Sequence, residues 1–163
     1  MKTRERIDKA LGYFLVTLMG ILVLDVLWQV ISRYILKSPS SFTDELARFL
    51  LIWVGILGAA YATGKKMHLA IDIIINRFDI KRRRLIDALI NAVIALFALC
   101  VMIIGGIHLM LILLKLGNTS AALSLPIGFV YSVIPLSGML IVYYSLSEIA
   151  TGWKQEPVHP STN

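Results

Sequence analysis

Hydrophobic residues fill four long runs of the chain, separated by short segments in which polar and charged residues gather. The runs cover residues 10–32, 46–63, 85–114 and 127–147. A helix needs about 20 consecutive apolar residues to cross the hydrocarbon core of a bilayer. The pattern therefore predicts an all-α polytopic membrane protein, with four transmembrane helices in a single membrane domain over residues 1–163.

Two of the runs contain features that predict departures from a straight helix. Thirty residues at about 1.5 Å each give the third run a length of about 45 Å, well beyond a core of about 30 Å. That helix must tilt or protrude, and Gly105–Gly106 offers it a place to bend. In the fourth run, Pro126 suits a first helical turn. Pro135 lies inside the run, so we expect a kink there.

The segment at residues 69–80 is too short to span a membrane and too apolar for a free loop. Placed on a helix, His68, Asp72, Asn76, Asp79 and Arg83 share one stripe, and the remaining surface is apolar. This pattern predicts a short amphipathic helix in the membrane interface; a plain reversing loop is the alternative. The polar residues at 151–163 are expected to form a disordered tail.

Composition supports lipid as the solvent of this chain. Hydrophobic residues make up 58% of it and charged residues 16%, with a mean hydropathy of +0.79, whereas soluble domains average about 45–50% and about 25%. The net charge is +6, but the basic residues form no stripe with interleaved aromatics. Nucleic acid is therefore not an expected partner. Cys100 lies in an apolar run and is expected to act as a small hydrophobe.

The distribution of basic residues predicts the orientation. With a cytoplasmic N-terminus, twelve of the 16 Lys and Arg residues lie on the inner side, against four on the outer side. Such a bias in short loops predicts that both termini are cytoplasmic. On the inner side, the expected membrane-interface anchors, in contact with lipid, are His68, Asp72, Arg82, Arg83 and Arg84.

Asp25 is the most deeply placed charge, because it lies inside the first run. An acid within a membrane span is a candidate for ion coupling. A lone carboxylate is a poor ion site, however, and the alternative is a structural role. In that case we expect Asp25 to bond to Gln29 or to pair with Arg48 of the antiparallel second span.

Asp44, Glu45 and Arg48 open the second run, and each has a local structural explanation. Acids stabilise the positive end of a helix dipole, Ser41 or Thr43 could cap the helix, and Asp44 and Arg48 are spaced as an ion pair. Glu45 and Arg48 are therefore expected to be structural charges.

The second run also contains small residues spaced for close helix packing. Gly55, Gly58, Ala59 and Ala62 lie at i, i+3, i+4 and i+7, so they form one flat face. Such a face favours a neighbouring protein helix.

Enzyme chemistry finds no support in the motifs. His68 and His108 are expected near opposite membrane surfaces, so they could not ligate one haem between them. The chain shows no serine-nucleophile motif, no phosphate-binding glycine loop and no HExxH zinc motif. We expect no enzyme and no bound cofactor.

The stretch at residues 43–72 resembles a known family. The order Glu45, Arg48, Trp53, then Gly58, Ala59 and Ala60, then His68 and Asp72 is similar to that in the small membrane subunit of tripartite ATP-independent periplasmic (TRAP) transporters. The chain length, the four runs and the basic N-terminus agree with it. The chain departs from the family pattern at Asp44–Glu45, where an aromatic residue is expected shortly before the acid. Phe42 could take that place.

The resemblance implies a non-catalytic scaffold subunit in a bacterial inner membrane. Its partners would be a large permease, which holds the substrate and sodium sites, and a periplasmic binding protein that captures an organic acid such as sialic acid or a C4-dicarboxylate. The small-residue face would contact the permease. The residues expected to dock the binding protein are Arg33, Lys37 and Lys115.

Two other classes remain open on the sequence alone. The chain could be a self-sufficient homo-oligomeric transporter or channel with Asp25 as its coupling residue. It could also be the membrane anchor of a respiratory enzyme, although the expected positions of the two histidines weaken that reading.

Overall fold

The computed structural model describes residues 2–38, 40–65 and 80–152, and nearly all of them are helical. A single antiparallel bridge, between Thr119 and Pro126, is the only β pairing in these ranges. The helical elements are α1 (Lys2–Tyr34), α2 (Ser41–Gly64), α4 (Ile80–Phe97), the π-helical segment η1 (Ala98–Gly105), α5 (Gly106–Lys115), α6 (Ile127–Tyr131) and α7 (Val133–Gly152).

Four stretches are long and apolar enough to cross a membrane, as the hydrophobic pattern predicted. They are Arg4–Tyr34, Ser41–Gly64, Leu85–Lys115 and Ile127–Ala150. The first helix also takes in the basic leader, and α4 begins at Ile80, so Arg82, Arg83 and Arg84 belong to its first turns. The expected interfacial helix at 69–80, with His68 and Asp72, lies almost wholly outside the described residues, as does most of the expected tail.

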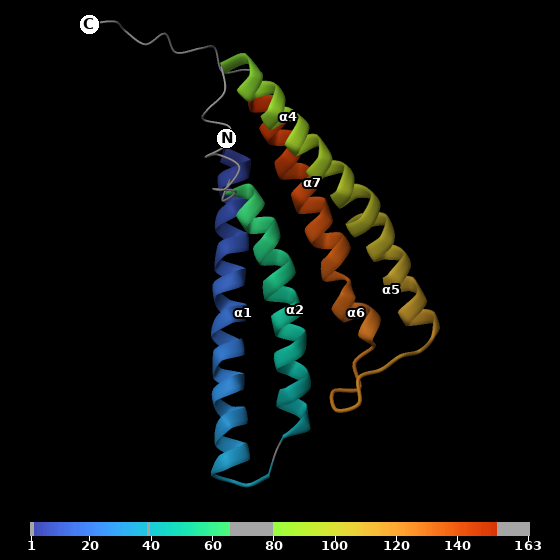
Figure 1. Ribbon diagram of the computed structural model, residues 1–163. Coiled ribbons are helices and arrows are strands. Elements are labelled where there is room, and N and C mark those ends of the chain that lie inside the picture. The colour runs from blue at the N-terminus through green and yellow to red at the C-terminus, as the bar shows by residue number, and fades with distance from the viewer. Residues whose placement is uncertain (1, 39, 66–79, 153–163) are drawn as a thin grey trace, which may run out of the picture.

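The helices stand in a row instead of closing into a round bundle (Figure 1). In that row α1 packs on α2, α2 packs on α7, and α7 packs on α4 and η1. The fourth span is the central one: 44% of its apolar window is buried, against 6–11% for the other three. Most of the apolar surface of the row is therefore left for lipid or another protein to cover.

Two small hydrophobic clusters hold the row together. Leu11, Leu57 and Val133 join α1, α2 and α7, while Ala60, Ala98 and Ile141 join α2, η1 and α7. Both clusters contain α7. The fourth span is thus the element against which the two halves of the row assemble.

The third span departs from α-helix geometry over the residues that lead up to Gly106. Eight residues, Ala98–Gly105, form the π-helical segment, whereas Gly105 and Gly106 both have ordinary right-handed helical dihedrals. The π-helical segment thus ends at the first glycine of the pair, and the bend expected there stays a prediction. A Cβ on Gly106 would lie 2.9 Å from Ile134 Cγ2 and Pro135 Cδ, so Gly106 allows close packing against α7.

The fourth span is interrupted where proline predicted a kink. It divides at Ser132 into α6 and α7, three residues before Pro135. The indole N–H of Trp53 in α2 donates to the carbonyl of Val130 at 3.0 Å. A neighbouring helix thereby satisfies a backbone acceptor at the break, as polar backbone within a membrane requires.

Candidate functional site

The carboxylate of Glu45 organises the loop between α5 and α6. It accepts hydrogen bonds from the hydroxyl of Ser120 and from three successive backbone amides, those of Ala121 at 3.0 Å, Ala122 at 3.0 Å and Leu123 at 3.1 Å. Hydrogen bonds to an ionised carboxylate are stronger than those between neutral groups. One side chain at the start of α2 therefore fixes a loop about 75 residues away in sequence.

The loop is also closed by its own backbone. The amide of Ser120 donates to the carbonyl of Leu125, and that of Ile127 to the carbonyl of Asn118, both at 2.9 Å. Ser120 is buried. The loop at 118–126 is therefore a compact, preformed structure at one end of the row.

The other end of the row is joined by Arg4 of α1. Its guanidinium pairs with Glu148 of α7 at 2.6 Å, donates to the carbonyl of Gly64 at the end of α2 at 2.7 Å, and lies 5.8 Å from the centre of the Tyr144 ring. A cation at a helix C-terminus satisfies a free carbonyl and complements the dipole. Arg4 thus links three helices.

Asp8, one turn along α1, completes this polar cluster. It accepts a hydrogen bond from the hydroxyl of Tyr144 at 2.6 Å and pairs with Lys65 at 3.5 Å. Tyr144 is fully buried, and a Cβ on Gly64 would lie 2.7 Å from its ring. Only glycine lets the end of α2 approach the tyrosine so closely.

The two polar ends lie about one hydrocarbon thickness apart. Nineteen residues of α2 separate Glu45 from Gly64, which at about 1.5 Å each is about 29 Å, against a core of about 30 Å. In the sequence, Arg4 is one of the basic residues that predict the orientation, and Glu45 has a local explanation in the helix dipole. The signal for a further role was the depth of Asp8 and Glu45, each at the edge of an apolar run.

The polar residues near Glu45 are paired differently from the sequence prediction. Asp44 pairs with Arg33 at 3.6 Å and accepts a hydrogen bond from Gln29 of α1, whereas Arg48 is exposed. The predicted Asp44–Arg48 pair is therefore wrong, because α1 supplies the partners. Neither predicted side-chain cap forms: Ser40 is the N-cap residue, without a side-chain cap hydrogen bond.

Asp25 is 8% exposed, and its Oδ2 atom is buried without a hydrogen-bond partner. Neither of the expected contacts, with Gln29 or with Arg48, occurs in the described part of the chain, since Gln29 donates to Asp44 and Arg48 is exposed. Within the same residue ranges, no group of three or more His, Cys, Asp and Glu side chains could hold a metal ion.

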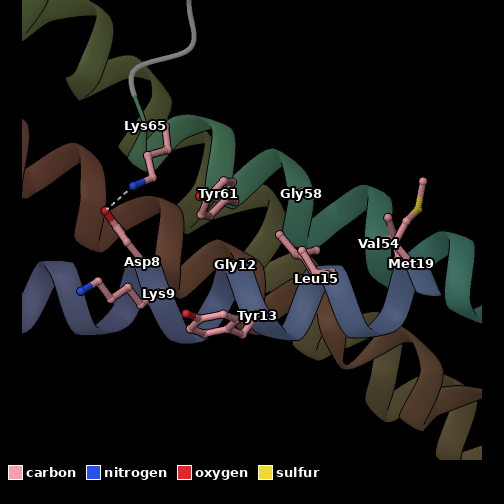
Figure 2. Close-up of a pocket in the computed structure, with 11 residues that line it drawn as sticks. Asp8, Lys9, Gly12, Tyr13, Leu15, Met19, Val54, Gly58, Tyr61 and Lys65 are labelled. Atoms are coloured by element: carbon pink, nitrogen blue, oxygen red, sulfur yellow. Dashed lines mark ion pairs between the residues drawn. The ribbon is translucent and has the colours of Figure 1, made fainter. Parts of the chain in front are cut away.

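The small residues of α2 lie on open surface. A Cβ on Gly55 or Gly58 would meet nothing within 4 Å, and Ala59 is exposed. Ala62 is half-buried, and Gly58 lines a groove between α1 and α2 (Figure 2). By contrast, a Cβ would lie within 3.0 Å of a neighbouring helix at three other glycines, which are Gly106, Gly128 and Gly138.

Of the predicted surface charges, Lys37 and Lys115 are exposed near the Glu45 end of the row, and Arg82 is exposed in the first turn of α4. Arg33 is half exposed but paired with Asp44. His108 is exposed on α5, and His68 lies outside the described residues.

Replacing Glu45 by Gln should loosen the loop at 118–126. The amide side chain keeps the size of Glu45 but loses the charge and presents an N–H₂ to a cluster of donors. We expect the amides of Ala121, Ala122 and Leu123 to exchange hydrogen at least about tenfold faster, measured by mass spectrometry in detergent. Arg48→Gln, one turn along α2, is the control and should leave these amides protected; equal protection in E45Q would contradict the clamp.

Neutralising Asp44 should destabilise the protein, whereas neutralising Asp25 should not. Asp25→Asn removes an acid whose Oδ2 has no partner, and should leave the melting temperature in detergent unchanged or raise it by about 2–4 °C. Asp44→Asn weakens the contacts with Arg33 and Gln29, so it should lower the melting temperature. A marked loss of stability in D25N alone would show that Asp25 has an essential ionic partner.

Comparison with known proteins agrees with the geometry. The family model described as "Tripartite ATP-independent periplasmic transporters, DctQ component" matches residues 22–155, which is most of the chain. A putative TRAP transporter small permease protein of Haemophilus influenzae is 26% identical over 135 residues, covering 83% of this chain and 82% of that protein.

Two further relatives have more specific names. The C4-dicarboxylate TRAP transporter small permease protein DctQ of Rhodobacter capsulatus is 32% identical over 112 residues, which cover 69% of this chain and 48% of that protein. The sialic acid TRAP transporter permease protein SiaT of Haemophilus influenzae is 30% identical over 95 residues, or 58% of this chain and only 15% of its own length.

The match over residues 22–155, the four apolar helices and the small permease relatives together identify the class, which is a multi-pass membrane component of a transporter and not an enzyme. Membership of a tripartite system implies that the partners of this subunit are a large permease and a periplasmic binding protein. The chain belongs to the DctQ family, the small permease subunits of TRAP transporters.

Proposed function

We propose that this subunit is a static scaffold that braces a large permease during sodium-coupled uptake of an organic acid. The observation that carries this proposal is the open row of helices, in which a Cβ on Gly55 or Gly58 of α2 would meet nothing within 4 Å among the described residues. Helices in lipid associate through close packing of small residues. Gly55, Gly58, Ala59 and Ala62 are the proposed contact with the permease.

The proposed orientation puts both termini in the cytoplasm of a bacterium and the Glu45 end of the row in the periplasm. The excess of Lys and Arg at the N-terminal end of α1 and the first turns of α4 supports it. Arg82, Arg83 and Arg84, with His68 and Asp72, would then lie at the inner leaflet. Each basic residue near an anionic surface contributes about 1 kcal/mol of attraction.

The periplasmic binding protein would dock at the Glu45 end. Lys37 and Lys115 are exposed there, and the clamped loop at 118–126 offers a preformed surface next to Lys115. Arg33 is the weaker candidate, because Asp44 already pairs with it. Charges at the rim of an interface chiefly raise the association rate.

The names of two relatives support an organic acid as the substrate class. One is named for C4-dicarboxylates and another for sialic acid, and both compounds are organic acids. Sodium and substrate sites would lie in the permease.

Gly55→Leu should weaken assembly with the permease. A leucine would fill the open surface over α2 and prevent close approach of a partner helix. We expect recovery of the large permease with a tagged small subunit to fall at least about tenfold, corresponding to about 1.4 kcal/mol. Gly20→Leu, on an equally open position of α1, is the matched control. Undiminished recovery with G55L would remove this face from the interface.

Orientation and docking can be tested together at Lys37. In a Cys100→Ser background, Lys37→Cys should react with a membrane-impermeant maleimide in intact spheroplasts, whereas Lys65→Cys should react only after permeabilisation. The reverse pattern would overturn the orientation.

Lys37→Glu should slow uptake about 2–10-fold at low binding-protein concentration and less at saturation, since only the association rate changes. Uptake equal to wild type at every concentration would exclude Lys37.

A further inference from the structure

A groove of about 550 Å³ runs along the outside of the α1–α2 pair (Figure 2). Its walls are apolar: Val16 and Met19 of α1 and Val54 of α2 line its deeper part. Its other end is polar, where Asp8, Lys9 and Lys65 lie close together. The groove therefore has the polarity of an amphipathic molecule, with one apolar length and one charged end.

A glycine of α2 keeps the groove open. Gly12 of α1 and Gly58 of α2 both line it, and a Cβ on Gly58 would meet nothing within 4 Å. A Cβ on Gly12 would lie 3.5 Å from the ring of Tyr61. A side chain at position 58 would occupy the space that the groove leaves open.

The charged end carries a surplus of positive charge. Lys65 pairs with Asp8 at 3.5 Å, and Asp8 is further engaged by the hydroxyl of Tyr144. Lys9 is exposed and has no ion pair within the ranges that the structure describes. Two ammonium groups and one carboxylate thus lie at this end of the groove, which leaves one positive charge in excess and attracts an anion.

The length of the groove matches one leaflet of a bilayer. From Asp8 to Met19 is eleven residues of α1, or about 16 Å at about 1.5 Å each. Half of a hydrocarbon core is about 15 Å. The lysines then lie at the depth of phosphate headgroups, beside the polar cluster of Arg4 and Asp8 that marks this end of the row.

We propose that this groove binds one anionic phospholipid from the surrounding leaflet. An acyl chain lies along Val16, Met19, Val54 and Gly58, and the phosphate is held by Lys9 and Lys65. The lipid would cover apolar surface of the α1–α2 pair and stiffen it. The site is present in the isolated subunit, and Gly58 is the one residue that it shares with the contact proposed for the permease.

The test uses the full-length subunit alone in detergent, titrated with phosphatidylglycerol or phosphatidylcholine and followed by native mass spectrometry. We expect a single tight phosphatidylglycerol and much weaker phosphatidylcholine. Lys9→Ala should weaken phosphatidylglycerol binding about fivefold. Arg6→Ala is its control, because Arg6 is exposed on the same part of α1 but does not line the groove.

A second pair of variants tests the apolar part. Gly58→Leu should abolish the single tight binding event, and Gly55→Leu, equally open but outside the groove, should keep it. Melting temperatures of all four variants confirm folding, and K9A keeps the test valid if G58L is unstable. Equal binding by K9A and R6A, or equal affinity for the two lipids, would mean ordinary boundary lipid and would overturn the proposal.

Discussion

Backbone groups inside a bilayer have no water to bond with, and this constraint explains the polar contacts of the chain. At three places where helix geometry stops, a side chain from another helix bonds to the free backbone groups. Glu45 accepts hydrogen bonds from amides of the loop at 118–126. Arg4 donates to the carbonyl of Gly64, and Trp53 donates to the carbonyl of Val130. Residues that look like isolated charges or aromatics in the sequence are therefore the partners of distant backbone.

The sequence predicts the four spans well because lipid acts as a uniform solvent, which selects apolar residues over a fixed length. It also predicts the break before Pro135, since that constraint is local. The sequence does not predict the partners of polar side chains, because they come from distant parts of the chain. Glu45 has a sufficient local explanation in the helix dipole, and nothing near it in the sequence indicates Ser120. The same limit explains why Asp44 was paired with the wrong residue.

Small residues show the limit most clearly. Gly58 and Gly138 are both glycines in apolar helices, yet a Cβ on Gly138 would lie 2.9 Å from Met102 Cβ, whereas one on Gly58 would meet nothing. Periodicity places Gly58 on a helix face but does not say which neighbour that face meets. Only the order of the helices in the row decides whether a glycine packs internally or remains open to a partner.

The two polar ends also bear on mechanism. Arg4 and Asp8 tie α1 and α2 to α7 at one end of the row, and Glu45 ties α2 to the loop before α6 at the other. A carrier needs an element with two arrangements of similar free energy, between which it can move. Sliding α2 past α7 would break charge-assisted hydrogen bonds at both ends of α2, a helix of 24 residues and about 36 Å. These contacts favour a rigid subunit, as the proposed role of a static scaffold for the permease requires.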